Sequence, residues 1–104
     1  MLWTNDKPNQ SFTPTILEFD LSEFTDVMIL FKFQTTSSGI RKPIIMPIGI
    51  NPLEKDPWIT ETDYDAKLIG RYIYPTPTGI IFGKGTSGNS DDNSKFIPVA
   101  VYVR

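Results

Sequence analysis

An alternation of apolar and polar side chains with a period of two constrains the fold of this chain more than any other feature. Across residues 25–34 one side carries Val27, Ile29, Phe31 and Phe33, and the other carries Met28, Leu30, Lys32 and Gln34. This period is typical of a β-strand, whose successive side chains point to opposite faces of a sheet. No window of ten or more residues shows the period of a helix, so we expect an all-β fold.

Turn signals divide the remainder of the chain into further short strands. We expect these over residues 15–20, 40–50, 78–83 and 95–103, and one or two more within 58–75, of which the second is 66–74. Pro43 and Pro47 each remove a donor from the ladder, which indicates an edge or bulged strand at 40–50. In the last strand we expect Ile97, Val99, Val101 and Val103 to face the core, with Tyr102 and Arg104 outward.

These strands predict an antiparallel β-sandwich or a jelly-roll-like barrel of about seven to nine short strands. The segment "DLSEF" allows a single helical turn at most, with Asp20 as its cap and Glu23 in capping-box spacing. Because domains most often run to about 100–150 residues, residues 1–104 are expected to form a single domain.

The stretch "GKGTSG" places Gly83, Gly85 and Gly88 in the pattern G-x-G-x-x-G. A dinucleotide-binding loop needs a helix that opens at the glycines and an acidic residue about 20 residues later. The residues that follow are poor helix formers and the spacing to an acid is wrong. We therefore expect a long, mobile hairpin loop over 84–94 that binds no nucleotide.

Composition removes several classes of function. The chain has no cysteine and no histidine, which excludes disulfides, Cys/His zinc sites and triads that depend on a histidine base. A net charge of −2 lacks the basic footprint of a nucleic-acid binder. No apolar run approaches the ~20 residues of a membrane-spanning helix. We expect neither nucleic-acid binding nor membrane insertion.

Both ends of the chain resemble a known family. The opening "LWTNDKPNQSF" with "LEFDLSEF", and the close "GIIFGKGTSGNSDDNSKFIPVAVYVR", are similar to a β-rich domain of phage and prophage structural proteins of Gram-positive bacteria. That family comprises minor structural, tail-fibre and baseplate proteins. The matching positions are Trp3, Thr4, Asn5, Asp20, Leu21, Ser22, Phe82, Gly83, Ile97, Pro98 and Tyr102. The resemblance covers about half of the chain and leaves out residues 40–75.

The resemblance implies a module of a larger virion protein, in the phage tail and extracellular where the tail meets its host. It also implies a homotrimer and a non-enzymatic role. We expect recognition of a cell-surface saccharide. The alternative is a purely structural module that trimerises or docks onto other virion proteins without a ligand, and a carboxylate-dependent glycosidase is a third hypothesis.

One candidate site is an acidic set, Glu61, Asp63 and Asp65, which would share one face of an extended segment. Clustered carboxylates are ligands for calcium, and a pair of them could cleave a glycosidic bond. A solvated strand face near Lys67 and Arg71 explains the same pattern. The expectation is therefore no cofactor, with calcium as the alternative.

A second candidate site combines aromatic and polar residues suited to sugars. Aromatic rings stack on the flat faces of sugar rings, and polar side chains bind the hydroxyl groups. The residues named for this role are Trp58, Tyr64, Arg71, Asp91 and Asp92. The competing interpretation places the aromatics in the core or at a subunit interface, and the two aspartates at an exposed loop tip.

Overall fold

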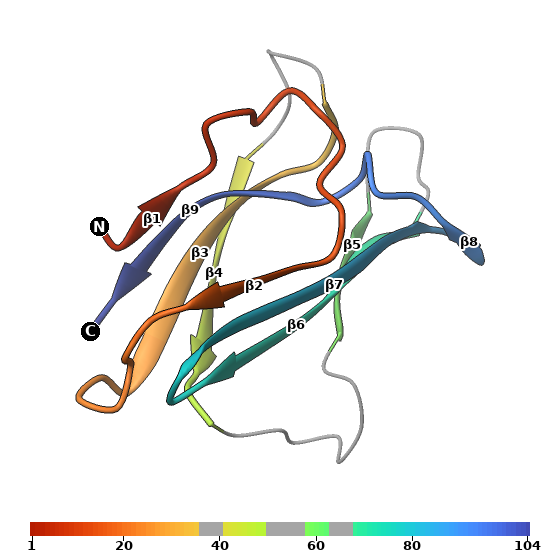
Figure 1. Cartoon of the computed structure of the whole chain (residues 1–104). Helices are drawn as coiled ribbons and strands as arrows, with labels where there is room; N and C mark the ends of the chain where they lie inside the picture. The colour runs from red at the N-terminus through yellow and green to blue at the C-terminus, as the bar shows by residue number, and fades with distance from the viewer. Residues whose placement is uncertain (36–40, 50–57, 63–67) are drawn as a thin grey trace.

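The computed structural model describes residues 1–35, 41–49, 58–62 and 68–104, and the part it describes folds into two antiparallel sheets (Figure 1). The first sheet has the order β1 (Trp3–Thr4), β9 (Ile97–Val103), β3 (Asp26–Lys32), β4 (Arg41–Pro47). The second has the order β2 (Thr15–Glu18), β7 (Gly79–Ser87), β6 (Leu68–Thr76), β5 (Trp58–Thr62), and β8 (Ser90–Asp91) pairs with β7.

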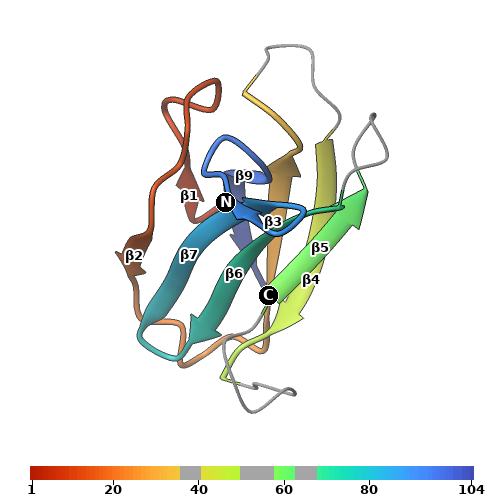
Figure 2. The ribbon, with the colours of Figure 1, turned by 90° about the vertical axis from the view of Figure 1, so that its right-hand side faces the viewer.

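The two sheets form the layers of a sandwich, and Figure 2 shows β2, β7, β6 and β5 side by side in that order. Their inner faces supply the core. From the first sheet, Val27, Ile29 and Phe31 are fully buried, and Ile80 and Phe82 meet them from the second. The expected all-β sandwich is thus confirmed. The described residues contain no helix, and hence none long and apolar enough to cross a membrane.

A bulge between β3 and β9 breaks the simple alternation expected of the last strand. Leu30 pairs with Ala100 while Phe31 pairs with Pro98, so Val99 is an extra residue on β9. Val99 is only partly buried and does not join the core cluster, whereas Val101 is fully buried. The expectation that Val99 faces the core is therefore wrong, because an inserted residue shifts the facing pattern of its strand.

Residues 84–94 do not form the long loop that the sequence suggests. Strand β7 continues through Gly83 and Gly85 to Ser87. The chain then turns at Gly88 and Asn89 and returns as β8. Gly88 has a φ of 58°, a left-handed conformation that glycine adopts without steric cost. This arm of the second sheet is a short hairpin.

The segment "DLSEF" forms a turn and no helix. The Asp20 carboxylate accepts hydrogen bonds from the Ser22 backbone N–H and the Ser22 hydroxyl, at 3.0 and 2.6 Å. This turn places Leu21 in the core with no exposed surface. These two bonds lower the pKa of Asp20 below its usual value.

Candidate functional site

A completely buried arginine, Arg71 in the middle of β6, organises one end of the sandwich. Its Nε donates to Phe96 O at 2.8 Å, and Nη1 donates to Phe12 O and Gly83 O, both at 2.8 Å. Nη2 donates to Asn93 O at 3.2 Å and to Lys95 O at 3.0 Å. A guanidinium has five N–H donors, so every one has a carbonyl partner.

We call this guanidinium and its five carbonyl partners the Arg71 cage. The charged N–H groups donate to backbone carbonyl oxygens, and these bonds hold the cage together. Burial lowers the pKa of Arg71 to about 10, and the charge of Asp92 opposes that change. The side chain therefore stays protonated at neutral pH. The Phe12 ring lies 5.4 Å from the guanidinium carbon and adds a cation–π contact.

The position of Arg71 corrects one of the saccharide-site expectations. The side chain points into the sandwich together with Ile69 and Ile73, and all its donors are used within the protein. A sugar at the surface would not reach it. Arg71 instead fixes the backbone of residues 83 and 93–96.

Two glycines of "GKGTSG" are explained by close packing. A Cβ added to Gly85 would lie 2.5 Å from Asp92 O and 2.9 Å from Nη2 of Arg71, so a side chain there would enter the cage. A Cβ on Gly83 would lie 2.7 Å from the Cβ of Tyr72. The glycines allow β7 to approach these groups, and no helix follows them in residues 83–104.

The chain between β8 and β9 is tied to the same end. The Gly85 N–H donates to the Asn93 side-chain oxygen at 2.9 Å. Asp92 accepts from the Ser94 N–H at 3.0 Å and from the Ser94 hydroxyl at 2.5 Å. The Asp92 side chain thus stabilises the turn between β8 and β9, whereas the Asp91 side chain pairs with Lys84.

The outer face of the second sheet carries a shallow groove, which we call the tyrosine groove. It is lined by Pro14, Tyr72, Ile73, Tyr74, Ile81, Gly83 and Lys84, with a volume of about 460 Å³. Tyr72 and Tyr74 are both half-buried and alternate along β6, so their side chains lie about 7 Å apart on one face. The face looks outward because Ile69, Arg71 and Ile73 take the inner positions.

An ion pair borders the tyrosine groove at the Tyr72 end. Lys84 Nζ lies 2.9 Å from Asp91 Oδ1 and 5.9 Å from the centre of the Tyr72 ring. The hydrogen bond to Asp91 raises the pKa of Lys84, so the ammonium remains charged at neutral pH. Donor and acceptor groups therefore lie side by side at the edge of an aromatic surface.

A second hollow continues along the same outer face. It has a volume of about 630 Å³ and is lined by Ile16, Glu18, Phe19, Asp20, Thr76, Pro77, Thr78, Gly79 and Ile81. Ile81 lines both hollows and is 41% exposed. The cross-strand pair Ile16–Ile81 extends the apolar surface from β7 onto β2.

Two further expected site residues, Trp58 and Glu61, lie on β5. Trp58 begins that strand and pairs in register with Tyr72, which places its backbone beside the tyrosine groove. Glu61 pairs with Ile69, and Tyr64, Asp63 and Asp65 lie outside the described residues. Among the residues that are described, no three acidic side chains come together as a metal site. The calcium hypothesis thus stays a prediction.

The outer face of the first sheet is a second surface of interest. Met28 pairs with Ile45 on one side and Tyr102 on the other, and Ile45 is 54% exposed. Residues 41–47 do not cover Met28, because they pair beside β3 and extend the same surface.

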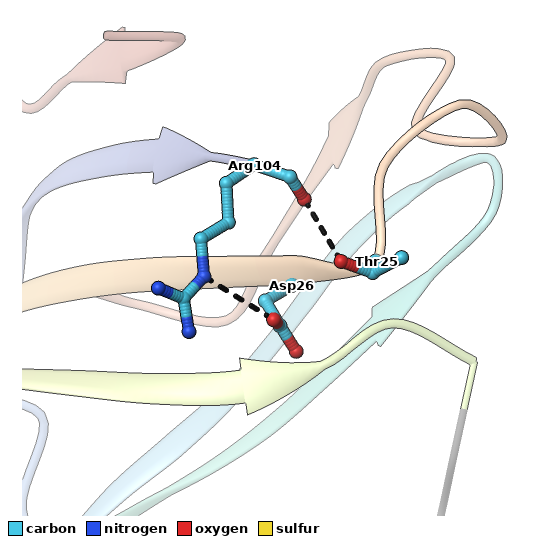
Figure 3. Close-up of polar contacts among 3 residues, drawn as sticks. All are labelled: Thr25, Asp26 and Arg104. Carbon is cyan, nitrogen blue, oxygen red and sulfur yellow. Dashed lines mark hydrogen bonds and ion pairs between the residues drawn. The ribbon is translucent and has the colours of Figure 1, made fainter.

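Polar contacts among Thr25, Asp26 and Arg104 lie at one edge of that surface (Figure 3). The Thr25 hydroxyl donates to Arg104 O at 3.2 Å, and Arg104 Nε donates to Asp26 Oδ2 at 3.3 Å. Backbone bonds between Asp26 and Arg104 add to this link. The last residue of the chain is thus tied to the start of β3, next to a small hollow of about 180 Å³ at Met28 and Tyr102.

Comparison with protein-family models, with curated protein sequences and with solved structures gave no match. The fold and the grooves therefore carry the functional argument. They define an antiparallel β-sandwich whose second sheet presents an aromatic groove bordered by an ion pair.

Proposed function

We propose that this chain is a non-enzymatic module that binds saccharide in the tyrosine groove. The observation that carries this proposal is the placement of Tyr72 and Tyr74 on one outer face, with the Lys84–Asp91 pair at its edge. Half-buried rings offer flat apolar faces to a sugar without having to be ordered on binding. Ligand sites commonly have volumes of about 300–1,000 Å³, and the groove falls in that range.

The ion pair suits the hydroxyl groups of a sugar. Two neighbouring hydroxyls together can accept one hydrogen bond and donate another. Lys84 supplies a donor and Asp91 an acceptor, 2.9 Å apart. Hydrogen bonds to charged groups are stronger than those between neutral groups, so this pair can orient a ring that the tyrosines hold.

The biological setting follows from the resemblance of both chain ends to phage and prophage structural proteins. In that setting the module belongs to a tail fibre or baseplate and binds polysaccharide on the host cell surface. A purely structural role in the virion is the alternative. It would leave the tyrosine groove covered by another virion protein.

The resemblance also favours a homotrimer. In this arrangement the outer face of the first sheet, with Met28, Ile45 and Tyr102, would be covered by neighbouring copies. A closed ring of copies hides such a surface without leaving an open end for further growth.

The experiment is a glycan-array screen of the purified domain, followed by titration calorimetry with the best ligand. Tyr74→Ala removes a stacking surface and should weaken binding about two- to twelvefold, since an aromatic contact contributes roughly 0.5–1.5 kcal/mol beyond its buried area. Phe24→Ala is the control, because Phe24 is 36% exposed and lines neither hollow. Binding that Tyr74→Ala leaves unchanged, or a domain that binds no glycan at all, would refute the proposal.

A further inference from the structure

The geometry points to a linear glycan without anionic groups as the ligand, lying across both hollows of the second sheet. This inference rests on the proposed saccharide function and names the class of ligand. Its first support is continuity, because Ile81 lines both hollows.

The length of the joined surface exceeds one sugar ring. Tyr72 lines the first hollow and Thr76 the second, four positions apart on the same strand. At roughly 3.3 Å per residue, they are about 13 Å apart. A ligand that contacts both ends must therefore contain several rings joined end to end.

The chemistry of the second hollow is that of a hydroxyl-binding site. Ile16 and Ile81 form an apolar floor, and the Thr76 and Thr78 hydroxyls lie 3.3 Å apart at its border. Glu18 and Asp20 supply carboxylates from the opposite side. Carboxylate oxygens accept hydrogen bonds from sugar hydroxyls and from amino groups.

The charges along the surface select against an anionic ligand. At the first hollow the Lys84 ammonium is neutralised by Asp91, so it offers an acidic sugar little net attraction. At the second hollow Glu18 and Asp20 give a net negative border, which repels uronic acids and phosphates. Two unit charges about 4 Å apart in water interact by about 1 kcal/mol, equivalent to roughly fivefold in affinity.

The test uses three β-1,4-linked series of matched length: neutral glucose oligomers, amino-sugar oligomers and uronic-acid oligomers, from one to six rings. They are titrated at low salt after the array has established that the domain binds glycan. We expect affinity to rise with each added ring until the surface is filled. We expect the uronic-acid series to bind roughly fivefold more weakly than the neutral series or worse.

Glu18→Gln tests whether the negative charge of Glu18 weakens the binding of anionic glycans. Glu18 is exposed on β2, so this variant should fold normally. It removes the charge but keeps a side-chain oxygen that accepts hydrogen bonds, so the affinity ratio between neutral and uronic-acid oligomers should become smaller. A single ring that binds as tightly as a hexamer, or a uronic-acid series that binds as well as the neutral one, would overturn this inference while leaving saccharide binding intact. Absence of binding to every glycan would instead refute the proposed function itself.

Discussion

Replacing Arg71 should cost this domain a large part of its stability. Arg71→Met keeps a long side chain but removes the charge and all five donors, and so leaves five inward-facing carbonyls without that partner. Each hydrogen bond to a charged group contributes about 1.5–3 kcal/mol, but the desolvation of the guanidinium offsets several kcal/mol of the sum. We expect a net loss of about 3–5 kcal/mol.

Arg71→Lys tests whether the shape of the guanidinium matters as well as its charge. An ammonium has three donors and lacks the planar fork, so at least two of the five carbonyls lose their partner. We expect a loss of at least about 2 kcal/mol, at about 1–3 kcal/mol for each unsatisfied buried group, but a smaller loss than for Arg71→Met. Charge alone should therefore restore only part of the stability.

Equilibrium unfolding in urea at neutral pH measures these differences. Arg104→Met is the matched control, because the Arg104 side chain is 71% exposed and its pairing with Asp26 should contribute about 0–1 kcal/mol. A small domain has a total stability of about 5–15 kcal/mol, so Arg71→Met should shift the midpoint strongly or prevent folding. A loss below about 1 kcal/mol for Arg71→Met would refute the argument that the Arg71 cage holds this end together.

Three further predictions address other parts of the structure. Gly83→Ala places a Cβ 2.7 Å from that of Tyr72 and should cost about 1–3 kcal/mol in a urea melt. Gly88→Ala has open space for its Cβ but keeps a positive φ, so it should cost about 1–2 kcal/mol through backbone strain alone. Asp20 has a lowered pKa, so its ionised form stabilises the fold above about pH 4 and this contribution is lost as the pH falls through the lowered pKa. The melting temperature of Asp20→Ala should accordingly fall less steeply in acid than that of the unsubstituted domain, and parallel curves would contradict this. Light scattering across a concentration series should give the mass of a trimer, which Met28→Lys dissociates; a monomer at all concentrations would exclude that assembly.

The alternation of side chains predicts the layers of this fold because it reports burial directly. Pro43 and Pro47 also predict the edge position of β4, which pairs only with β3 among the described strands. The alternation further assigns Arg71 to the same side as Ile69 and Ile73. That assignment conflicts with a role for Arg71 in binding sugar, and the buried position is the correct one.

The Arg71 cage, the bulge in β9 and the lining of the tyrosine groove depend on pairing between distant segments, which a local sequence pattern does not contain. The Arg71 cage joins β6 to Phe12 and to residues 93–96, so its partners cannot be found by spacing. The bulge at Val99 is likewise a property of the β3–β9 pair. The alternation along β6 is enough to predict that Tyr72 and Tyr74 share an outward face. Their contact with Ile81 and Lys84 depends on the register of β6 with β7, which the alternation does not contain.

The two prolines of β4 also bear on aggregation. Pro43 and Pro47 are four residues apart on β4, which pairs with β3 along its length. Because the backbone N–H groups of alternate residues in a strand point to the same side, both prolines lack a donor on the same side of β4. A proline has no N–H, and prolines in edge strands lie where the missing donor would have pointed away from the sheet. The side of β4 away from β3, which pairs with no other strand in the described part of the chain, thus lacks every second donor that an incoming strand would need. Even at high protein concentration, copies of this domain should resist edge-to-edge polymerisation along β4.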